Sequence, residues 1–167
     1  AVRIGQLAHV LEMMNEVKKI TRRSHVVDLG SGDGEALAYI SKRYGCNVTG
    51  IEYEEALVGM ALETFAKNNL KKYRFVHGDF ATLDSDWLVR IGATHVYAFD
   101  GVYGAEHWDE LFHRVIAGGP KGLTGASCSR WSRYWPEGLE KQKGRGVAVG
   151  LTGSTSTFTF RVWKKRV

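Results

Sequence analysis

The sequence is poor in residues that build covalent or metal-held frameworks. Its two cysteines, Cys46 and Cys128, lack CxxC spacing, and its six histidines show no metal-ligand spacing such as HxxxH. We therefore expect neither a disulfide framework nor a metal site. The cysteine usage favours a reducing, intracellular compartment. A chain of 167 residues can bury a core without such staples.

Long apolar runs are also missing. No run approaches the roughly 20 residues that a membrane helix needs, and no signal-peptide pattern opens the chain, so we expect no membrane association. The hydrophobic fraction of 44% and the charged fraction of 25% are typical of a folded domain. The net charge of +5 favours acidic partners such as nucleic acid.

Helix-like and strand-like segments alternate along the chain. Apolar residues recur at helical spacing in residues 4–19, 35–44, 54–68 and 106–116. Short apolar segments typical of buried strands cover residues 25–29, 47–52, 74–77, 95–99 and 123–128. Two strands, 147–151 and 157–163, follow without a helix between them, and the second has the period of a half-exposed antiparallel strand.

This order predicts an α/β fold. We expect a Rossmann-like, seven-stranded, mostly parallel sheet with helices on both faces and a C-terminal antiparallel hairpin. One domain should cover residues 1–167. Its parts are an N-terminal helical segment (1–23), a cofactor-binding core (24–128), a basic aromatic loop (129–146) and the hairpin (147–167).

A glycine-rich segment, Val27-Asp28-Leu29-Gly30-Ser31-Gly32-Asp33-Gly34-Glu35, joins the first strand to the next helix. Glycine there permits positive φ and close approach of a ligand, and ligands bind beyond the carboxyl ends of such strands. The dinucleotide fingerprint GxGxxG needs glycine at position 35, which is Glu35, and no phosphate-loop Gly-Lys-Ser/Thr follows. The acidic residues of this segment suit a ligand with sulfonium and ammonium groups better than a pyrophosphate.

Two further carboxylates follow the second and third strands. Glu52 can accept hydrogen bonds from both hydroxyls of a ribose, a group that nicotinamide cofactors and S-adenosylmethionine share. Asp79 can accept from an adenine amino group, with Phe80 against the ring. Taken alone, Asp79 is better explained as a capping or turn residue, and its register with the glycine segment and Glu52 favours the binding role.

As a set, these motifs resemble the class I S-adenosylmethionine-dependent methyltransferase superfamily over roughly residues 24–163. The resemblance implies S-adenosylmethionine as the cofactor. It also implies a cofactor site built from Asp28, Gly30, Gly32, Glu35, Glu52, Asp79 and Phe80.

A narrower resemblance is to the DOT1 family of histone H3 lysine methyltransferases. It rests on the segments 28–34, 50–52 and 78–80, on the block from His95 to Gly104, and on Trp108-x-x-Leu111-Phe112. It implies lysine methylation of histone H3 in the nucleosome by a nuclear protein. Where that family has an Asn-Asn pair this sequence has Phe99-Asp100, and the family's upstream channel loop has no counterpart in it.

Methyl transfer to an amine is an in-line displacement that depends on proximity and orientation more than on a strong base. We expect Asp100 to orient or deprotonate the amine, and Tyr103 to line its channel. Their structural alternatives are a turn acid and a core aromatic. We expect a basic aromatic stretch to contact nucleic acid or a nucleosome, or else to form a solvated loop: Arg130, Trp131, Arg133, Tyr134, Trp135, Lys141, Lys143 and Arg145.

Three alternatives remain open at this point. The first is a methyltransferase for RNA or a small molecule, although Asp100 is followed by Gly-Val and not by the Pro-Pro-Tyr of many base-amine methyltransferases. The second is a cofactor-binding module without catalysis. The third, a nicotinamide enzyme, is disfavoured by Glu35.

The ribose assignment predicts that Glu52→Ala weakens S-adenosylmethionine binding by about 1.5–3 kcal/mol, the loss expected for hydrogen bonds to a charged group. Isothermal calorimetry measures this directly. An unchanged affinity would show that the ribose does not lie at Glu52.

Overall fold

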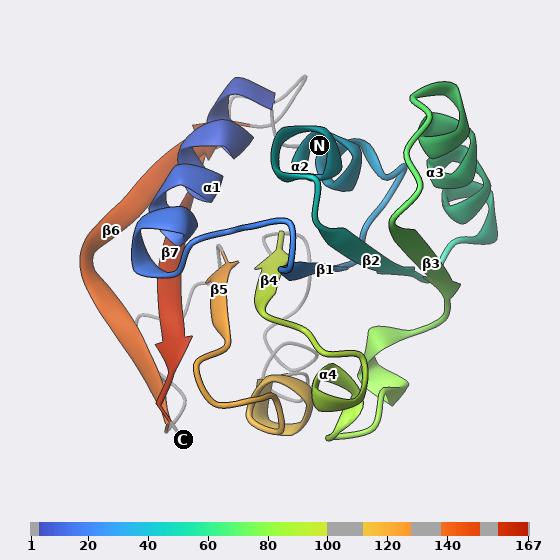
Figure 1. The fold of residues 1–167 in the computed structure, drawn as a ribbon. Coiled ribbons are helices and arrows are strands. Elements are labelled where there is room, and N and C mark those ends of the chain that lie inside the picture. The colour runs from blue at the N-terminus through green and yellow to red at the C-terminus, as the bar shows by residue number, and fades with distance from the viewer. Residues whose placement is uncertain (1–3, 100–111, 128–137, 151–156, 167) are drawn as a thin grey trace.

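A seven-stranded sheet in the order β3-β2-β1-β4-β5-β7-β6 forms the centre of the molecule (Figure 1). The computed structural model describes residues 4–99, 112–127, 138–150 and 157–166. The strands are β1 (His25–Leu29), β2 (Asn47–Glu52), β3 (Tyr73–His77), β4 (His95–Ala98), β5 (Thr124–Ser127), β6 (Leu139–Gly150) and β7 (Thr157–Lys165). The first five are parallel, and β7 runs antiparallel to both β5 and β6. The predicted Rossmann-like fold with its antiparallel C-terminal strands is confirmed.

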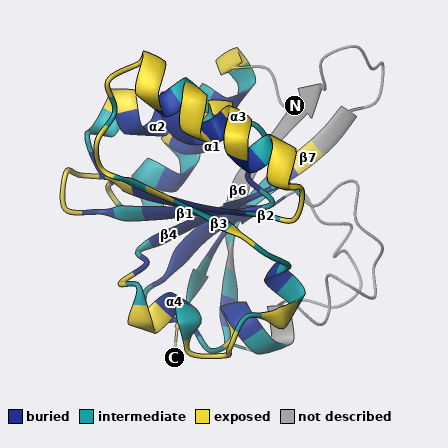
Figure 2. Ribbon diagram, turned by 90° about the vertical axis from the view of Figure 1, so that its right-hand side faces the viewer, coloured by how far each residue is buried: buried dark blue, intermediate teal, exposed yellow. Residues whose placement is uncertain are grey.

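Helices cover both faces of the sheet (Figure 2). One face carries α1 (Ile4–Val17), α2 (Glu35–Tyr44) and α3 (Glu55–Lys67); the other carries α4 (Trp87–Arg90), the 3-10 turn η1 (Phe80–Thr82) and the π-helical turn η2 (Phe112–Ile116). Successive strand residues point to opposite faces, so Val26 packs under α1 and α2, whereas Val27 packs with the second layer. Two apolar cores result, one on each side of the sheet.

Helix α2 begins and ends at glycines in the left-handed conformation. Gly34 precedes it with φ 79°, and Gly45 follows it with φ 63° and donates its N–H to the Ser41 carbonyl. Glu35 in the first turn and basic residues in the last turn complement the helix dipole. These ends fix where the glycine-rich segment meets the helix.

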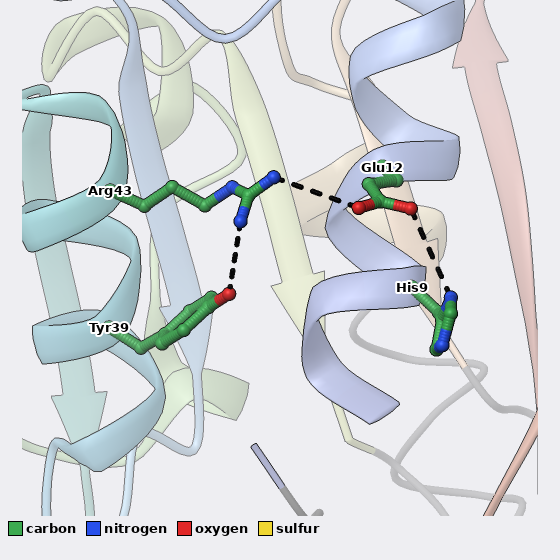
Figure 3. A network of polar contacts seen from close by, with 4 residues as sticks. All are labelled: His9, Glu12, Tyr39 and Arg43. Atoms are coloured by element: carbon green, nitrogen blue, oxygen red, sulfur yellow. Dashed lines mark hydrogen bonds and ion pairs between the residues drawn. The ribbon is translucent and has the colours of Figure 1, made fainter. Parts of the chain in front are cut away.

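A polar network links α1 to α2 on the surface (Figure 3). Arg43 donates from Nη1 to the Tyr39 hydroxyl at 3.3 Å, and its Nη2 lies 3.7 Å from Glu12 Oε1. His9 Nδ1 lies 3.9 Å from the other Glu12 oxygen. Because these side chains are largely in water, the network orients the helices and contributes little to stability.

The structure corrects two boundaries. The N-terminal helix ends at Val17, well short of residue 23, because the polar segment 18–24 turns back into β1. The predicted basic loop 129–146 is too long, because β6 already begins at Leu139 and pairs with β7. A register shift between Lys141 and Gly146 hides the period of that lysine-rich edge strand. Of the helix expected over 106–116, only the part from Phe112 onward lies within the described residues, and it forms a π-helical turn.

None of the helices in the described portion combines the length and the apolar character that crossing a membrane requires.

His95 is buried at the start of β4. Its Nε2 lies 2.9 Å from the Lys18 carbonyl oxygen and its Nδ1 lies 2.8 Å from the Thr94 hydroxyl. Desolvation lowers the pKa of His95 to about 4. The unfolded chain therefore binds a proton that the folded chain excludes between about pH 6.5 and pH 4.

We expect the contribution of His95 to stability, about 3 kcal/mol, to be complete above about pH 6.5 and to be lost as the pH drops toward 4. Urea unfolding between pH 4 and 7.5 measures the slope. The variant His95→Gln should flatten it, while the control His9→Gln, at an exposed site, should not. Identical slopes for the wild type and His95→Gln would contradict this account.

Candidate functional site

The glycine-rich segment is a loop that only glycine can build. Gly30, Gly32 and Gly34 have φ of 86°, 55° and 79°, all in the left-handed region. The N–H groups of Gly30 and Ser31 both donate to the Ile51 carbonyl at the end of β2, at 2.9 and 3.0 Å. The loop is therefore held at the carboxyl ends of β1 and β2.

Glu52 joins this loop to the segment that follows β2. Its Oε2 accepts from the Gly32 N–H at 2.8 Å, and its Oε1 accepts from the Glu54 N–H at 3.0 Å. Each carboxylate oxygen keeps a second lone pair. Glu52 can thus position the loop and still accept from the hydroxyls of a ligand.

A pocket of about 120 Å³ opens above the loop. Among the described residues that line it, the charged ones are Asp28, Asp33 and Glu35, all acidic, and none is lysine, arginine or histidine. Apolar walls come from α1 and from the end of β4: Ile4, Leu7, Tyr97 and Phe99. The pocket therefore favours a ligand that is cationic and partly apolar.

Asp28 is the buried charge of this pocket. It is 3% exposed, and its Oδ1 has no hydrogen-bond partner within the described part of the chain. Desolvation, and then the nearby charge of Glu52, raise the pKa of Asp28 well above its ordinary value. The buried hydroxyl of Ser31 lacks a described partner as well. Two unsatisfied polar groups beside one pocket indicate that a ligand completes their hydrogen bonding.

These residues fit the cofactor that the sequence motifs imply. S-adenosylmethionine carries a sulfonium and an α-ammonium, which the acidic lining would attract, and a ribose, which Glu52 would accept. The loop glycines leave room for the cofactor to approach the backbone.

The structure places the predicted site residues in two groups. Asp28, Gly30, Gly32 and Glu35 line the pocket, with Glu52 bonded to its loop. The other two, Asp79 and Phe80, follow the next strand and do not line it. That connection is tied to β2 by the Gly78 N–H, which donates to the Glu52 carbonyl at 2.9 Å.

Asp79 acts here as the cap of η1, since its Oδ1 accepts from the Ala81 N–H at 2.9 Å. Phe80 is buried in the core on the far face of the sheet. Asp79 still has its second oxygen for a ligand, and the adenine contacts of both residues stay a prediction.

The expected catalytic residues Asp100 and Tyr103 lie outside the described residues, as do Arg130, Trp131 and Arg133. Tyr134 and Trp135 lie outside them too. Of Lys141, Lys143 and Arg145 only the backbone, in β6, is described.

Sequence reasoning missed several residues of the pocket. Ile4 and Leu7 come from α1, far from the motifs in sequence, and no local signal marks them. Tyr97 and Phe99 alternate at the end of β4, a position where ligands bind, and that signal was available.

Comparisons with known proteins agree with this geometry. The sequence profile of the family described as "Methyltransferase domain" matches residues 26–115. The chain is 33% identical over 107 residues to the sterol 24-C-methyltransferase of Schizosaccharomyces pombe, which covers 60% of this chain and 27% of that enzyme. It therefore spans about a quarter of the length of this curated relative.

Two solved structures share the fold across nearly the whole chain. An RNA methyltransferase from Salinibacter ruber, in complex with S-adenosyl-L-homocysteine, is 21% identical with a TM-score of 0.66 and covers 94% of this chain and 90% of its own. An rRNA methylase from Streptococcus thermophilus is 13% identical with a TM-score of 0.70 and covers 100% of both chains. The methyltransferase superfamily is supported, and the DOT1 family is not.

Because Asp28 is buried, we expect Asp28→Asn to stabilise the cofactor-free protein and to weaken cofactor binding. Because the folded pKa is raised, ionising Asp28 costs stability as the pH rises above the unfolded value. Asp28→Asn should therefore raise the unfolding free energy of the cofactor-free protein at pH 8 by about 1–3 kcal/mol. It should also weaken S-adenosylmethionine binding, because the ligand loses a buried counter-charge.

Urea unfolding and calorimetry measure the two effects. The control Asp33→Asn, in the same loop but half-buried, should leave unfolding nearly unchanged. A less stable Asp28→Asn, or one that binds the cofactor as the wild type does, would overturn the assignment.

Proposed function

Because this chain belongs to the class I S-adenosylmethionine-dependent methyltransferase superfamily, we propose that it is a methyltransferase that acts on RNA. The observation that carries the catalytic part is the pocket at the end of β1, where the charged residues of the described lining are all acidic. Such a lining attracts a sulfonium cofactor and repels the pyrophosphate of a dinucleotide.

When bound, the cofactor would supply a methyl group on a positively charged sulfur. In-line attack of an acceptor atom on the methyl group would displace that sulfur. Asp28, Asp33 and Glu35 would hold its cationic groups, and Glu52 would hold its ribose. Ile4 and Leu7 exclude water from one side. The chain thus contributes orientation and desolvation, the two effects on which this displacement depends.

Two features support RNA as the acceptor. The chain carries a net charge of +5, which suits a polyanion. The RNA methyltransferase of S. ruber and the rRNA methylase of S. thermophilus also match it over almost their entire length, so their size and architecture are the same. We propose that the basic stretch from Arg130 to Arg145 contacts this RNA. We also propose that the protein acts inside the cell.

A small molecule is the second candidate. The sterol methyltransferase of S. pombe is the relative with 33% identity, although the match covers only 27% of that enzyme. An apolar acceptor would fit beside the aromatic pair Tyr97 and Phe99.

Lysine methylation of histone H3 is a third acceptor to be tested. It rests on the DOT1-like block from His95 to Gly104, most of which lies outside the described residues, and the comparisons lend it no support. The nucleosome as partner and the nucleus as location depend on that assignment and stay predictions.

Transfer of labelled methyl from S-adenosylmethionine to total RNA, reconstituted nucleosomes, free core histones and a sterol mixture separates these candidates. We expect label on RNA that ribonuclease releases, and less of it with Glu52→Ala. Label on sterols or on histone H3 would replace RNA by that acceptor. Binding of cofactor without any transfer would instead indicate a non-catalytic module.

A further inference from the structure

The topology sorts the charges of this chain onto two opposite edges of the sheet. Segments that follow parallel strands lie at the carboxyl edge, and segments that lead into them lie at the amino edge. At the carboxyl edge, residues 28–35, 52–55 and 78–82 contain seven Asp or Glu and no Lys or Arg. The net charge of +5 is therefore not spread evenly over the surface.

The amino edge is the reverse. We define it by the segments 18–24, 42–47 and 67–74, which lead into β1, β2 and β3. They hold four, two and four lysines or arginines, ten in all, and no Asp or Glu. Since these three strands are neighbours in the sheet, the three segments lie side by side along one edge, about 10 Å wide from the first strand to the third.

A hollow lies in the middle of the amino edge. Its volume is about 390 Å³, and it is lined by three cations from two of the segments and by four uncharged residues. The lining residues are Arg22, Ser41, Gly45, Asn69, Leu70, Lys71 and Lys72. Arg22, Lys71 and Lys72 are exposed. The hollow thus presents positive charge from two sides to a ligand in water.

Two of the ten cations have partners elsewhere: Arg43 lies 3.7 Å from the Glu12 carboxylate, and Lys18 donates to the Gly122 carbonyl at 3.2 Å. The recorded ion pairs of the described residues do not involve Arg22, Lys71 or Lys72, whereas Arg90 and Arg166 are paired with carboxylates. Lys72 donates to the Gly45 carbonyl at 3.1 Å and so closes the end of α2. Desolvation and the charge of Lys164 both lower the pKa of Lys18, so positive potential continues toward the end of β7.

We propose that the amino edge is a docking surface for the phosphate backbone of single-stranded RNA, separate from the cofactor pocket. The choice of RNA over DNA rests on the proposed function. The attraction between these cations and a phosphate backbone does not depend on that function. A row of cations along neighbouring strands matches a linear polyanion, whose backbone contacts dominate affinity without reading sequence.

An acidic protein fits this edge less well. Six of the ten cations are lysines, a residue that is depleted from protein–protein interfaces and common at phosphate contacts. The acidic carboxyl edge would repel the RNA backbone, whereas the amino edge would attract it. RNA should therefore approach the molecule first from the side of the amino edge.

Fluorescence anisotropy with a labelled 20-nucleotide RNA, without cofactor and between 50 and 300 mM NaCl, tests the surface. The edge variant Arg22→Gln/Lys71→Gln spares Lys72, which closes α2. It should bind about tenfold more weakly, and its salt slope should fall by about 1.4, since each lost phosphate contact on a single strand accounts for about 0.7.

Two controls accompany it. Arg22→Lys/Lys71→Arg keeps the charge and should bind like the wild type. Arg161→Gln, on β7 opposite Ser127 at the carboxyl end of β5, removes one charge away from the amino edge and should weaken binding less than about twofold, whereas Arg22→Gln alone should weaken it about threefold (estimates from the sequence-independent phosphate term). All variants should keep their S-adenosylmethionine affinity by calorimetry, which shows that they are folded.

The proposal is overturned if the edge variant binds RNA as tightly as the wild type, or if Arg161→Gln weakens binding as much as Arg22→Gln does. Competition by poly-glutamate as strong as that by RNA would overturn the choice of a nucleic acid. Transfer to sterols or histones instead of RNA would refute the proposed function while the binding curves still decide on the amino edge.

Discussion

The candidate site depends on the hydrogen bonds that tie the glycine loop to the end of β2. The Ile51 carbonyl accepts from Gly30 and Ser31, and the Glu52 carboxylate accepts from Gly32. These bonds are possible because the loop adopts positive φ, which side chains with a Cβ resist. The same bonds bring Glu52 next to a loop that is otherwise separated from it by a whole helix. Without these bonds, the glycine loop that lines the pocket would no longer be held next to Glu52, the residue that we propose as the ribose acceptor.

Stability and binding compete in this pocket. Asp28 is buried without a described partner for Oδ1, and Ser31 is in the same position, so the cofactor-free fold carries groups that it does not satisfy. A cationic ligand removes part of that cost when it binds. At His95 the interior follows the usual rule, because a buried imidazole stays neutral between the Lys18 carbonyl and the Thr94 hydroxyl. The contrast between Asp28 and His95 is in keeping with the binding role that we propose for Asp28.

Parallel topology gives the two edges of the sheet different electrostatic roles. Acidic residues follow the strands and meet at the pocket, while basic residues lead into the strands and meet at the opposite edge. A sulfonium cofactor and an RNA backbone carry opposite charges, so each is attracted to a different edge. One chain can therefore bind both without the two ligands competing for a surface. A residue of the acidic edge can also have a structural role, since the Asp79 carboxylate caps η1.

The order of helices and strands, the glycine loop and the acidic residues Asp28, Glu35 and Glu52 were all readable in the sequence, because each depends on local periodicity or on backbone conformation. The β6 boundary was not, since a register shift interrupts its pattern. Nor were the contributions of Ile4 and Leu7 to the pocket, or the placement of Arg22 and Lys71 around one hollow, because these residues come from segments that lie apart in the chain. Local sequence thus determined the elements and the loop chemistry, whereas only the packing of α1 and the strand order β3-β2-β1 decided which side chains share a surface.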